Sequence, residues 1–429
     1  MFSDIELYPG LRTALEKLGH EHATDIQEKA VPLALAGHDL QVCARTGTGK
    51  TLAYLIPVVQ QLCGDPLPNR AGALALILAP TRELARQVFK TCESLTASTP
   101  LNVMLICGGE SLRFQTAALR KNPEILVATP GRLLELMDQQ AVDLAGLRIL
   151  VLDEADRVLE MGFGEDVTRI AGACPAGRQT LMLSATLTGR GIGGLTRDLL
   201  RNPLLLDMTA EQTDTIEHCR LLSDDRHHRN QQLTWLLQHQ AYDRALVFAN
   251  TRQTTEQLFT LLRAQGLAVG VLHGEKDQQA RKATLTRFRQ GAIRVLVASD
   301  VAARGIDIPE VELVVNFELP RKGDDYRHRV GRTGRAGRAG LAISLVEPGQ
   351  WNLMIDLQRY LKLDFSELQI ETLRGKFRGP KKTRGSGKSV GVKKKKKKPA
   401  SASGAARKSS RKSPAKTAPT GNETFRRKR

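Results

Sequence analysis

The stretch LQVCARTGTGKTLAYLIPVV, residues 40–59, indicates the fold class of this 429-residue chain. A short apolar run, residues 40–44, leads into the glycine-rich segment RTGTGKT, which a helical pattern follows. Apolar runs of this kind recur between helical patterns along most of the chain. Near-continuous apolar strands that alternate with helices are typical of a parallel sheet covered by helices on both faces. We therefore predict an α/β fold.

The order of the apolar runs predicts two domains in tandem. A first group lies at residues 73–80, 102–109, 124–130, 147–156 and 179–186, and a second at 244–250, 268–274, 293–300, 311–320 and 340–348. The polar stretch 207–228 separates the groups and has no clean period. We predict a first domain over residues 1–208, a linker over 209–220 and a second domain over 221–373, which ends with a helix near 351–363.

The last 56 residues, 374–429, differ from the rest in charge. They hold 22 of the 64 basic residues and one of the 45 acidic residues, so they carry +21 while residues 1–373 carry −2. Lysine, arginine, serine, alanine, glycine and proline dominate, with six consecutive lysines at 393–398. Such a composition cannot bury enough apolar surface to offset the entropy of ordering. We predict a disordered tail that binds a polyanion or acts as a targeting signal.

The cysteines and the first residues indicate the compartment. Six widely spaced cysteines form no CxxC pair and no zinc pattern with histidine. Cys43 and Cys107 lie in apolar runs, which predicts buried, reduced thiols. The N-terminal residues do not resemble a secretory signal, and no apolar run approaches the roughly 18 residues of a membrane span. We expect a soluble protein of a reducing compartment, without a membrane partner.

The segment ARTGTGKT, residues 44–51, matches the phosphate-binding pattern G-x-x-x-x-G-K-[ST] except that Ala44 replaces its first glycine. Gly47 and Gly49 allow the backbone to bend so that its N–H groups and the helix N-terminus face a phosphate chain. Lys50 would reach the outer phosphates and Thr51 would hold Mg²⁺. A glycine-rich turn without a ligand is the alternative, which the position between strand and helix disfavours.

A second cluster, Asp153-Glu154-Ala155-Asp156, follows an apolar run at residues 147–152. The carboxyl ends of strands are the edge where α/β sheets bind ligands. The carboxylates could merely cap the next helix. Together with a phosphate loop they suggest a Mg²⁺ ligand, Asp153, and a group that positions or deprotonates water, Glu154. A nucleotide-hydrolysing enzyme is the favoured interpretation.

A third segment, HRVGRTGR at residues 328–335, precedes the last strand of the second domain. Arg329, Arg332 and Arg335 recur at every third residue, which suits either phosphate binding or a solvated basic loop. The first domain lacks an obvious arginine finger, a group that contributes about 10³ to 10⁵ in rate. If the second domain supplies it, catalysis requires the two domains to close.

These motifs and others occur in one order: TDIQ (24–27), ARTGTGKT, PTREL (80–84), TPGR (129–132), DEAD (153–156), SAT (184–186), VFANTR (247–252), SDVAARGID (299–307) and HRVGRTGR. From about Phe2 to residue 370, the chain resembles the DEAD-box family of ATP-dependent RNA helicases. The resemblance implies two RecA-like domains, with ATP between them and RNA across both.

The resemblance also implies roles for single residues. Gln27 would read the adenine edge, and Phe2 would stack on the same base. Ser184 and Thr186 would link hydrolysis to unwinding, Asp307 would contact the ribose, and Arg332 and Arg335 would reach the γ-phosphate. The catalytic set is then Lys50, Asp153, Glu154, Arg332 and Arg335, and the remaining nucleotide contacts are Ala44, Arg45, Thr46, Gly47, Thr48, Gly49 and Thr51.

For RNA, the resemblance implies contacts that carry small side chains, hydroxyls or guanidinium groups. They are Arg82, Gly109, Thr129, Gly131 and Arg132 in the first domain and Thr251, Arg252, Arg281 and Ser299 in the second. Such groups suit sugar and phosphate contacts, which position a strand without reading its sequence. Three positions depart from the family pattern: Ala23 replaces a proline, His20 an aromatic residue and Ser299 a threonine, whose hydroxyl it keeps.

The expected function is ATP-dependent remodelling of RNA duplexes or RNA–protein complexes. A core with a short basic extension looks most like the bacterial helicases of ribosome assembly, with structured ribosomal RNA as substrate, ribosomal proteins as possible partners and a monomeric core. We expect a cytoplasmic location, or a nucleolar one in a eukaryote. The tail would tether RNA, although its lysines also suit a nuclear signal. The competing hypotheses are an RNA-binding scaffold and a DNA translocase.

Overall fold

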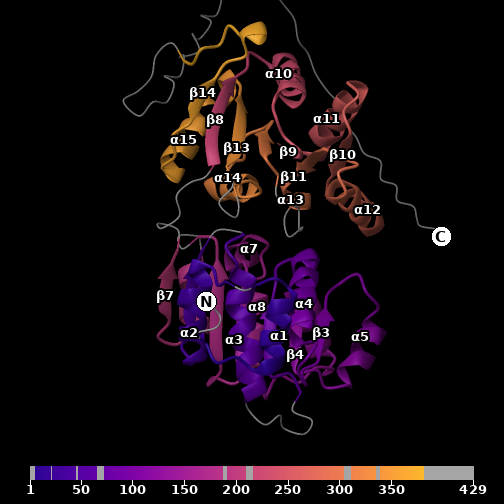
Figure 1. Cartoon of the computed structure of the whole chain (residues 1–429), viewed down its shortest axis with the longest axis vertical. Coiled ribbons are helices and arrows are strands. Elements are labelled where there is room, and N and C mark those ends of the chain that lie inside the picture. Colours follow the sequence, from indigo (N-terminus) through magenta and orange to yellow (C-terminus); the bar gives the residue numbers. More distant parts are fainter. Residues whose placement is uncertain are drawn as a thin grey trace, which may run out of the picture. The chain divides into compact units, whose positions relative to one another are not determined.

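The computed structural model describes residues 5–20, 22–44, 47–64, 72–186, 191–208, 216–303, 311–334 and 339–380. These residues form two seven-stranded sheets, each with its own helices (Figure 1). We call the described residues up to 208 the first lobe and those from 216 to 380 the second lobe. The predicted α/β fold with two tandem parallel-sheet domains is confirmed. The tail beyond residue 380 lies outside the described residues.

The sheet of the first lobe has the strand order β3-β4-β2-β5-β6-β1-β7, and all neighbours run parallel. Its strands are β1 (Leu40–Cys43), β2 (Ala75–Leu78), β3 (Val103–Ile106), β4 (Ile125–Ala128), β5 (Ile149–Leu152), β6 (Gln179–Ser184) and β7 (Leu204–Asp207). Its helices are α1 (Pro9–Lys17), α2 (Asp25–Leu35), α3 (Lys50–Gly64), α4 (Arg82–Thr96), α5 (Leu112–Leu119), α6 (Pro130–Asp138), α7 (Ala155–Glu160), α8 (Gly164–Gly172) and α9 (Ile192–Leu199).

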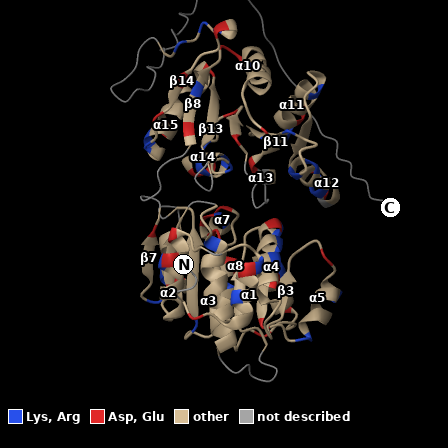
Figure 2. Ribbon diagram, viewed as in Figure 1, with Lys and Arg blue, Asp and Glu red and all other residues tan. Residues whose placement is uncertain are grey.

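Helices cover both faces of this sheet, as the uninterrupted apolar runs predict. Successive residues of a strand point to opposite faces, so Ala75 and Ile77 of β2 pack with α1 to α4. Leu76 and Leu78 pack on the other face, with α6, α8 and α9. Strands β1 to β6 contain no charged residue, and Figure 2 shows the charges of this lobe mainly on helices and at strand ends. The charged side chains of this lobe therefore lie on the helices and beyond the ends of these strands, not within them.

The sheet of the second lobe has the order β10-β11-β9-β12-β13-β8-β14, again with parallel neighbours. Its strands are β8 (Ile216–Leu222), β9 (Ala245–Ala249), β10 (Val269–Leu272), β11 (Val295–Ser299), β12 (Leu313–Asn316), β13 (Gly340–Val346) and β14 (Ser366–Leu368). Its helices are α10 (Arg226–His239), α11 (Arg252–Ala264), α12 (Gln278–Arg289), α13 (Asp300–Ala303), α14 (Gly323–Val330) and α15 (Trp351–Leu361), with 3₁₀ turns at Pro348–Gln350 and Glu371–Leu373.

The boundaries of the second lobe differ from those predicted. Residues 216–220, assigned to the linker, form the first part of β8. Apolar and polar residues do not alternate there because β8 lies inside the sheet, paired with both β13 and β14. At the other end, residues 374–380, assigned to the tail, are described and contact this lobe through Lys376 and Phe377.

The cysteine prediction holds for the described residues. Cys43 and Cys107 are free and buried, and burial raises the pKa of the Cys43 thiol to about 12 and that of Cys107 to about 11. Thiols with such raised pKa values remain protonated and unreactive near neutral pH. Among the described residues, no helix is both long and apolar enough to cross a membrane.

Candidate nucleotide and RNA sites

The glycine-rich loop connects the end of β1 to the start of α3. Gly47 and Gly49 have φ values of 89° and 92°, a left-handed region that strains residues with a side chain. A Cβ on Gly49 would lie 2.4 Å from Nε2 of Gln27. Lys50 begins α3, and its Nζ donates a 2.6 Å hydrogen bond to the carbonyl oxygen of Ala44. The loop therefore has the tight bend that the sequence predicts, and the structure shows in addition that its lysine is buried.

Gln27 and Thr24 bind the backbone of this loop. Nε2 of Gln27 donates to the carbonyl of Gly49 at 3.0 Å, and the hydroxyl of Thr24 donates to the carbonyl of Thr48 at 2.8 Å. The Oε1 atom of Gln27 accepts from the N–H of Thr24 at 3.0 Å, as part of a capping box that starts α2. Gln27 therefore lies at the nucleotide loop, but both ends of its amide bind protein groups. Its contact with adenine stays a prediction.

Asp153 and Glu154 follow β5, at the carboxyl edge of the sheet. The hydroxyl of Tyr54 donates to Oδ2 of Asp153 at 2.9 Å, and the N–H of Glu154 donates to Oδ1 at 2.9 Å. Glu154 has φ 48° and ψ 53°, in the left-handed region. Such a conformation is unfavourable for a residue with a side chain and is often found at functional sites. It turns the chain from β5 into α7 with Glu154 half-buried.

Burial makes these carboxylates weaker acids than usual. Burial is the main cause that raises the pKa of Asp153, and the nearby Lys50 acts in the opposite direction. Burial and the neighbouring Asp153 raise the pKa of Glu154. A raised pKa increases the proton affinity of a carboxylate, which suits a group that accepts a proton from water. The geometry and the electrostatics therefore agree with the base role predicted for Glu154.

Asp156 connects the carboxylate cluster to β6. Its Oδ2 atom accepts a hydrogen bond from the N–H of Ala185 at 3.1 Å. Beside Ala185, the hydroxyl of Ser184 donates to the carbonyl of Thr186 at 2.7 Å and accepts from the N–H of Thr186 at 3.1 Å. The Thr186 hydroxyl is buried and has no hydrogen-bond partner among the described residues. The predicted coupling residues, Ser184 and Thr186, are therefore one hydrogen bond from the predicted catalytic segment.

The donor set fits Mg²⁺ bound together with a nucleotide. Thr51 lies in the first turn of α3. Tyr54, about one turn further along α3, donates a hydrogen bond to the carboxylate of Asp153, so Asp153 lies beside the start of this helix. Among the described residues, no group of three or more His, Cys, Asp or Glu could hold a metal. Mg²⁺ in nucleotide sites uses one or two protein ligands plus phosphates and water. Thr51 and Asp153 satisfy that smaller requirement.

Three predicted RNA-contact segments of the first lobe line one hollow. Its lining includes Arg82, Gly109, Thr129, Gly131 and Arg132. A Cβ on Gly109 would lie 2.5 Å from a guanidinium nitrogen of Arg82, and Gly109 has φ 83°. Nη1 of Arg132 donates to the Glu110 carbonyl and to Gln115 Oε1, both at 3.0 Å. Residues up to 50 positions apart thus meet beyond the ends of β2, β3 and β4.

The predicted RNA contacts of the second lobe also lie at strand ends and helix starts. Thr251 caps α11 by accepting from the N–H of Thr254 at 3.1 Å, and Arg252 forms an ion pair with Glu275. Arg281 donates from Nη2 to the Ala302 carbonyl at 3.2 Å. Ser299 ends β11 and is buried. Strands β9 and β11 are neighbours, so Thr251 and Ser299 lie on the same edge of the sheet.

Arg329 has neither of the roles considered for the arginine-rich segment. It is 1% exposed, and its guanidinium group binds both carboxylate oxygens of Asp300 at 2.6 and 2.7 Å. It also donates to Asn250 Oδ1, Asn316 Oδ1 and the Glu318 carbonyl at 2.6 to 3.2 Å. Arg329 is therefore an internal clamp rather than a phosphate ligand or a solvated side chain.

The other two arginines of this segment are Arg332, which is described, and Arg335, which lies outside the described residues. Arg332 follows the C-terminal end of α14, where its carbonyl accepts from the N–H of Val311 at 3.1 Å. Five predicted nucleotide contacts lie outside the described residues: Phe2, Arg45, Thr46, Asp307 and Arg335.

Comparison with known proteins agrees with this geometry. Residues 24–193 match the model of the DEAD/DEAH box helicase family, and residues 228–337 match that of the helicase conserved C-terminal domain. The ATP-dependent RNA helicase SrmB of Escherichia coli is 40% identical over 381 residues, which cover 88% of this chain and 86% of that protein. The chain belongs to the DEAD-box family of ATP-dependent RNA helicases.

Other relatives and solved structures support the assignment. The ATP-dependent rRNA helicase rrp3 of Aspergillus niger is 42% identical over 348 residues, which cover 80% of this helicase and 73% of that protein. Saccharomyces cerevisiae Dbp5 bound to RNA and ADP BeF3 has 30% identity and a TM-score of 0.77, covering 86% of this chain and 95% of that one. The resemblance, the RecA-like fold and the ATP-dependent helicase activity that we predicted are confirmed.

The structure adds three side chains to the predicted sites of the helicase. Tyr54 binds Asp153, Asp156 binds Ala185, and Gln115 donates to the Cys107 carbonyl at 2.9 Å while it accepts from Arg132. Tyr54 could have been found from the sequence because it lies four residues after Lys50, on the same face of α3. Asp156 and Gln115 act across different segments, so no local signal identifies their partners.

Proposed function

We propose that this helicase uses ATP with Mg²⁺ to open short duplexes in ribosomal RNA during ribosome assembly. The observation that carries the proposal is the hydrogen bond from Ala185 to Asp156, because it connects the hydrolytic segment to the predicted coupling residues. The RNA substrate class is supported by the name of the Aspergillus niger relative, an rRNA helicase. It is also supported by a contact set of hydroxyls and guanidinium groups, which suits the RNA backbone.

The proposed roles follow from the nucleotide loop. The phosphate chain binds the N–H groups of the loop and of the first turn of α3, and Lys50 leaves the Ala44 carbonyl to bind the outer phosphates. Thr51 and Asp153 would hold Mg²⁺, which neutralises phosphate charge when bound. Glu154 orients a water molecule and accepts its proton. Arg332 and Arg335 stabilise the negative charge that develops on the transferred phosphoryl group.

Coupling to RNA follows if each ligand contacts both lobes. The predicted nucleotide and RNA contacts come from both lobes, so ATP and RNA each favour the same closed arrangement and therefore each other's binding. A strand that is held bent in the closed form cannot stay in a regular duplex, and a few base pairs open. Hydrolysis then removes the contacts of the outer phosphate, and the RNA is released.

One experiment tests the proposal against its competitors. The full chain is assayed for ATP hydrolysis with matched single-stranded RNA, single-stranded DNA and a ribosomal RNA hairpin. We expect stimulation by both RNAs and little by DNA. Equal stimulation by DNA would favour the DNA translocase, and tight RNA binding without stimulated turnover would favour the scaffold. A hairpin that stimulates hydrolysis without being opened would contradict the remodelling role.

We also propose a cytoplasmic, monomeric enzyme, nucleolar in a eukaryotic source, with ribosomal proteins as partners and the basic tail as an RNA tether. Residues 381–429 contribute +18 to a chain whose other residues carry +1, and such charge binds polyanions in a salt-dependent way. Truncation after residue 380 keeps the contacts of Lys376 and Phe377. The truncated chain should bind RNA more weakly at low salt yet hydrolyse ATP normally at saturating RNA.

A further inference from the structure

The segment that precedes the tail is bound to the second lobe. The carboxylate of Asp224 accepts hydrogen bonds from the N–H groups of Lys376 at 2.8 Å and Phe377 at 2.6 Å. Nε2 of His228 lies 2.8 Å from the carbonyl oxygen of Leu373. A Cβ on Gly375 would lie 2.7 Å from Asp224 Oδ1. The backbone of Leu373, Lys376 and Phe377 is therefore bound to side chains at the start of α10 and just before it.

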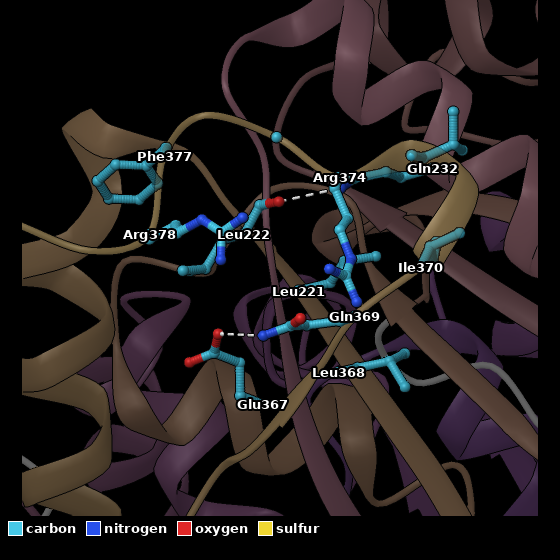
Figure 3. Close-up of a pocket in the computed structure, with 12 residues that line it drawn as sticks. Leu221, Leu222, Gln232, Glu367, Leu368, Gln369, Ile370, Arg374, Phe377 and Arg378 are labelled. Atoms are coloured by element: carbon cyan, nitrogen blue, oxygen red, sulfur yellow. Dashed lines mark hydrogen bonds between the residues drawn. The ribbon is translucent and has the colours of Figure 1, made fainter.

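This segment closes a small pocket at the edge of the sheet (Figure 3). The apolar side of the pocket includes Leu221, Leu222 and Ile370. Figure 3 shows the side chains of Arg374 and Arg378 directed into the pocket from the bound segment. The pocket measures about 40 Å³, and one water-sized group needs about 10–15 Å³. The pocket therefore has room for a phosphate-sized group and is too small for a nucleoside.

The charges of the pocket favour an anion. Arg374 and Arg378 are its cationic residues, and Glu367 is its acidic one. Glu367 already accepts from Nε2 of Gln369 at 3.3 Å and lies 3.6 Å from Arg220. Arg374 forms an ion pair with Glu371, whose side chain is 80% exposed. Exposed pairs of this kind contribute only about 0–1 kcal/mol, so a phosphate can replace Glu371 as the partner of Arg374.

Two aromatic rings lie beside the pocket. Phe377 lines it and meets Trp351 edge-on, with ring centroids 6.2 Å apart. The Arg220 guanidinium lies 5.4 Å from the centroid of Trp351. Both rings are half-buried. Aromatic rings next to arginines are typical of surfaces on which single-stranded bases stack while phosphates are neutralised.

From this arrangement we propose a second RNA-binding site, in which Arg374 and Arg378 hold one backbone phosphate and Phe377 contacts the adjoining base. Paired guanidinium forks match phosphate oxygens in geometry as well as in charge. RNA is the polyanion favoured because the chain is an RNA helicase and because its basic tail begins a few residues after Arg378. The site deepens the proposed function, since it adds a contact for the same RNA outside the helicase motifs.

The test compares two full-length double variants that remove the same charge. Arg374→Gln with Arg378→Gln removes the pocket arginines, whereas Arg359→Gln with Lys362→Gln removes exposed charges that do not line it. Binding of labelled single-stranded RNA is measured as a function of salt. Single-stranded RNA contributes a slope of about 0.7 per neutralised phosphate, and the site neutralises one phosphate, so the pocket variant should lose about 0.7 in slope and bind roughly fourfold more weakly at 0.15 M salt. The control variant should retain the wild-type slope.

Three further measurements separate the explanations. If the pocket variant unfolds in urea at the same concentration as the wild type, the second lobe is intact. If it unfolds at a lower concentration, the variant Arg374→Lys with Arg378→Lys is used in its place. That variant keeps the charge, so we expect it to weaken RNA binding less than the glutamine variant does. Inorganic phosphate at constant ionic strength should compete weakly with RNA. Competition by phosphate combined with wild-type RNA affinity of the pocket variant would assign the pocket to free phosphate and overturn the proposal. If RNA stimulates ATP hydrolysis by the wild type and all variants bind RNA equally, only this second site is overturned. If RNA does not stimulate hydrolysis by the wild type, the proposed function itself is contradicted.

Discussion

The two lobes have one topology but use it differently. When their strands are numbered from the first strand of each lobe, both sheets have the order 3-4-2-5-6-1-7. In the first lobe, the loop after the first strand has two left-handed glycines and ends at Lys50. In the second lobe, the corresponding strand, β8, leads to Asp224 and Asp225, which bind the 376–377 backbone and cap α10. The fold alone therefore does not create a phosphate loop.

The edge predicted to bind RNA is duplicated. Thr81 after β2 and Thr251 after β9 have φ and ψ of −126° and about 150°, and each caps the following helix. Each threonine precedes an arginine, Arg82 or Arg252. The edge predicted to bind nucleotide is not duplicated, because β12 leads to Phe317 and Glu318 where β5 leads to Asp153 and Glu154. From this comparison we expect both lobes to contact RNA, and the first lobe to supply the carboxylates that act in hydrolysis.

The largest expected effect comes from Glu154, the carboxylate of the first lobe that we predict to act on water. Glu154→Gln removes the proton acceptor, and loss of a general base costs about 10²- to 10⁴-fold in rate. We expect kcat for ATP to fall by that factor while nucleotide binding, measured with a fluorescent ATP analogue, changes little. As a control, Glu318→Gln in the second lobe should leave turnover within a few-fold of wild type. A larger loss in the control would show that the second sheet also contributes a hydrolytic carboxylate.

The next largest effect concerns the internal clamp of the second lobe. Arg329→Gln leaves Asp300 without its guanidinium partner, and breaking a buried pair costs about 3–5 kcal/mol. The exposed pair Arg252–Glu275 provides the control, since Arg252→Gln should cost about 0–1 kcal/mol. Both tryptophans of the chain, Trp235 and Trp351, lie in the second lobe, so their fluorescence in urea follows its unfolding. Equal stabilities of the two variants would contradict the clamp.

The rate of ATP hydrolysis should depend on pH, by about tenfold per unit on the acidic side, through Glu154 of the first lobe. Glu154 must be deprotonated to accept a proton, and burial with the adjacent Asp153 raises its pKa. Below that raised pKa, the active fraction falls about tenfold per pH unit. Activity should therefore decline on acidification at a higher pH than an exposed glutamate would cause. In Glu154→Gln the residual activity should lack this acidic limb, and a limb that persists would assign the titration to another group.

The smallest effects should be equal in the two lobes. Thr81→Ala and Thr251→Ala each remove a helix cap, which costs about 0.5–2 kcal/mol. Since the two caps have the same backbone geometry, we expect similar losses in the free energy of unfolding by circular dichroism in urea. We also expect similar, small reductions in RNA affinity. A loss of RNA affinity in only one variant would show that the duplicated geometry does not mean duplicated binding.

Much of the site could be predicted because its signals are local. The bend at Gly47 and Gly49, the position of Asp153 at a strand end and the threonine before α11 follow from residue types and spacing within one strand, loop or helix. The role of Arg329 could not be predicted in this way. Arg329 and Arg332 belong to the same run of arginines at every third residue, so the sequence does not distinguish them. The hydrogen-bond partners of Arg329 come from positions 250, 300, 316 and 318, which only the folded sheet brings together.

The boundaries show the same limit. The stretch 216–220 forms a strand because its backbone pairs with β13 and, at Cys219 and Arg220, also with β14, and both strands are more than 100 residues away in the sequence. Residues 374–377 have the composition of the tail, yet Asp224 binds the backbone N–H groups of Lys376 and Phe377. Composition describes how a segment behaves in isolation, and it does not include a partner from a distant element.

The sequence by itself determined the fold class, the DEAD-box family, the nucleotide loop and the charge difference between body and tail. These properties depend on residue type, short spacing and periodicity, which the chain carries whether or not it is folded. The tertiary structure decided which loops share an edge, that Arg329 is buried, that Asp156 reaches Ala185 and that two arginines before the tail face one pocket. These properties depend on contacts between distant segments, because the hydrogen bonds and burial that define them exist only when the strands are paired.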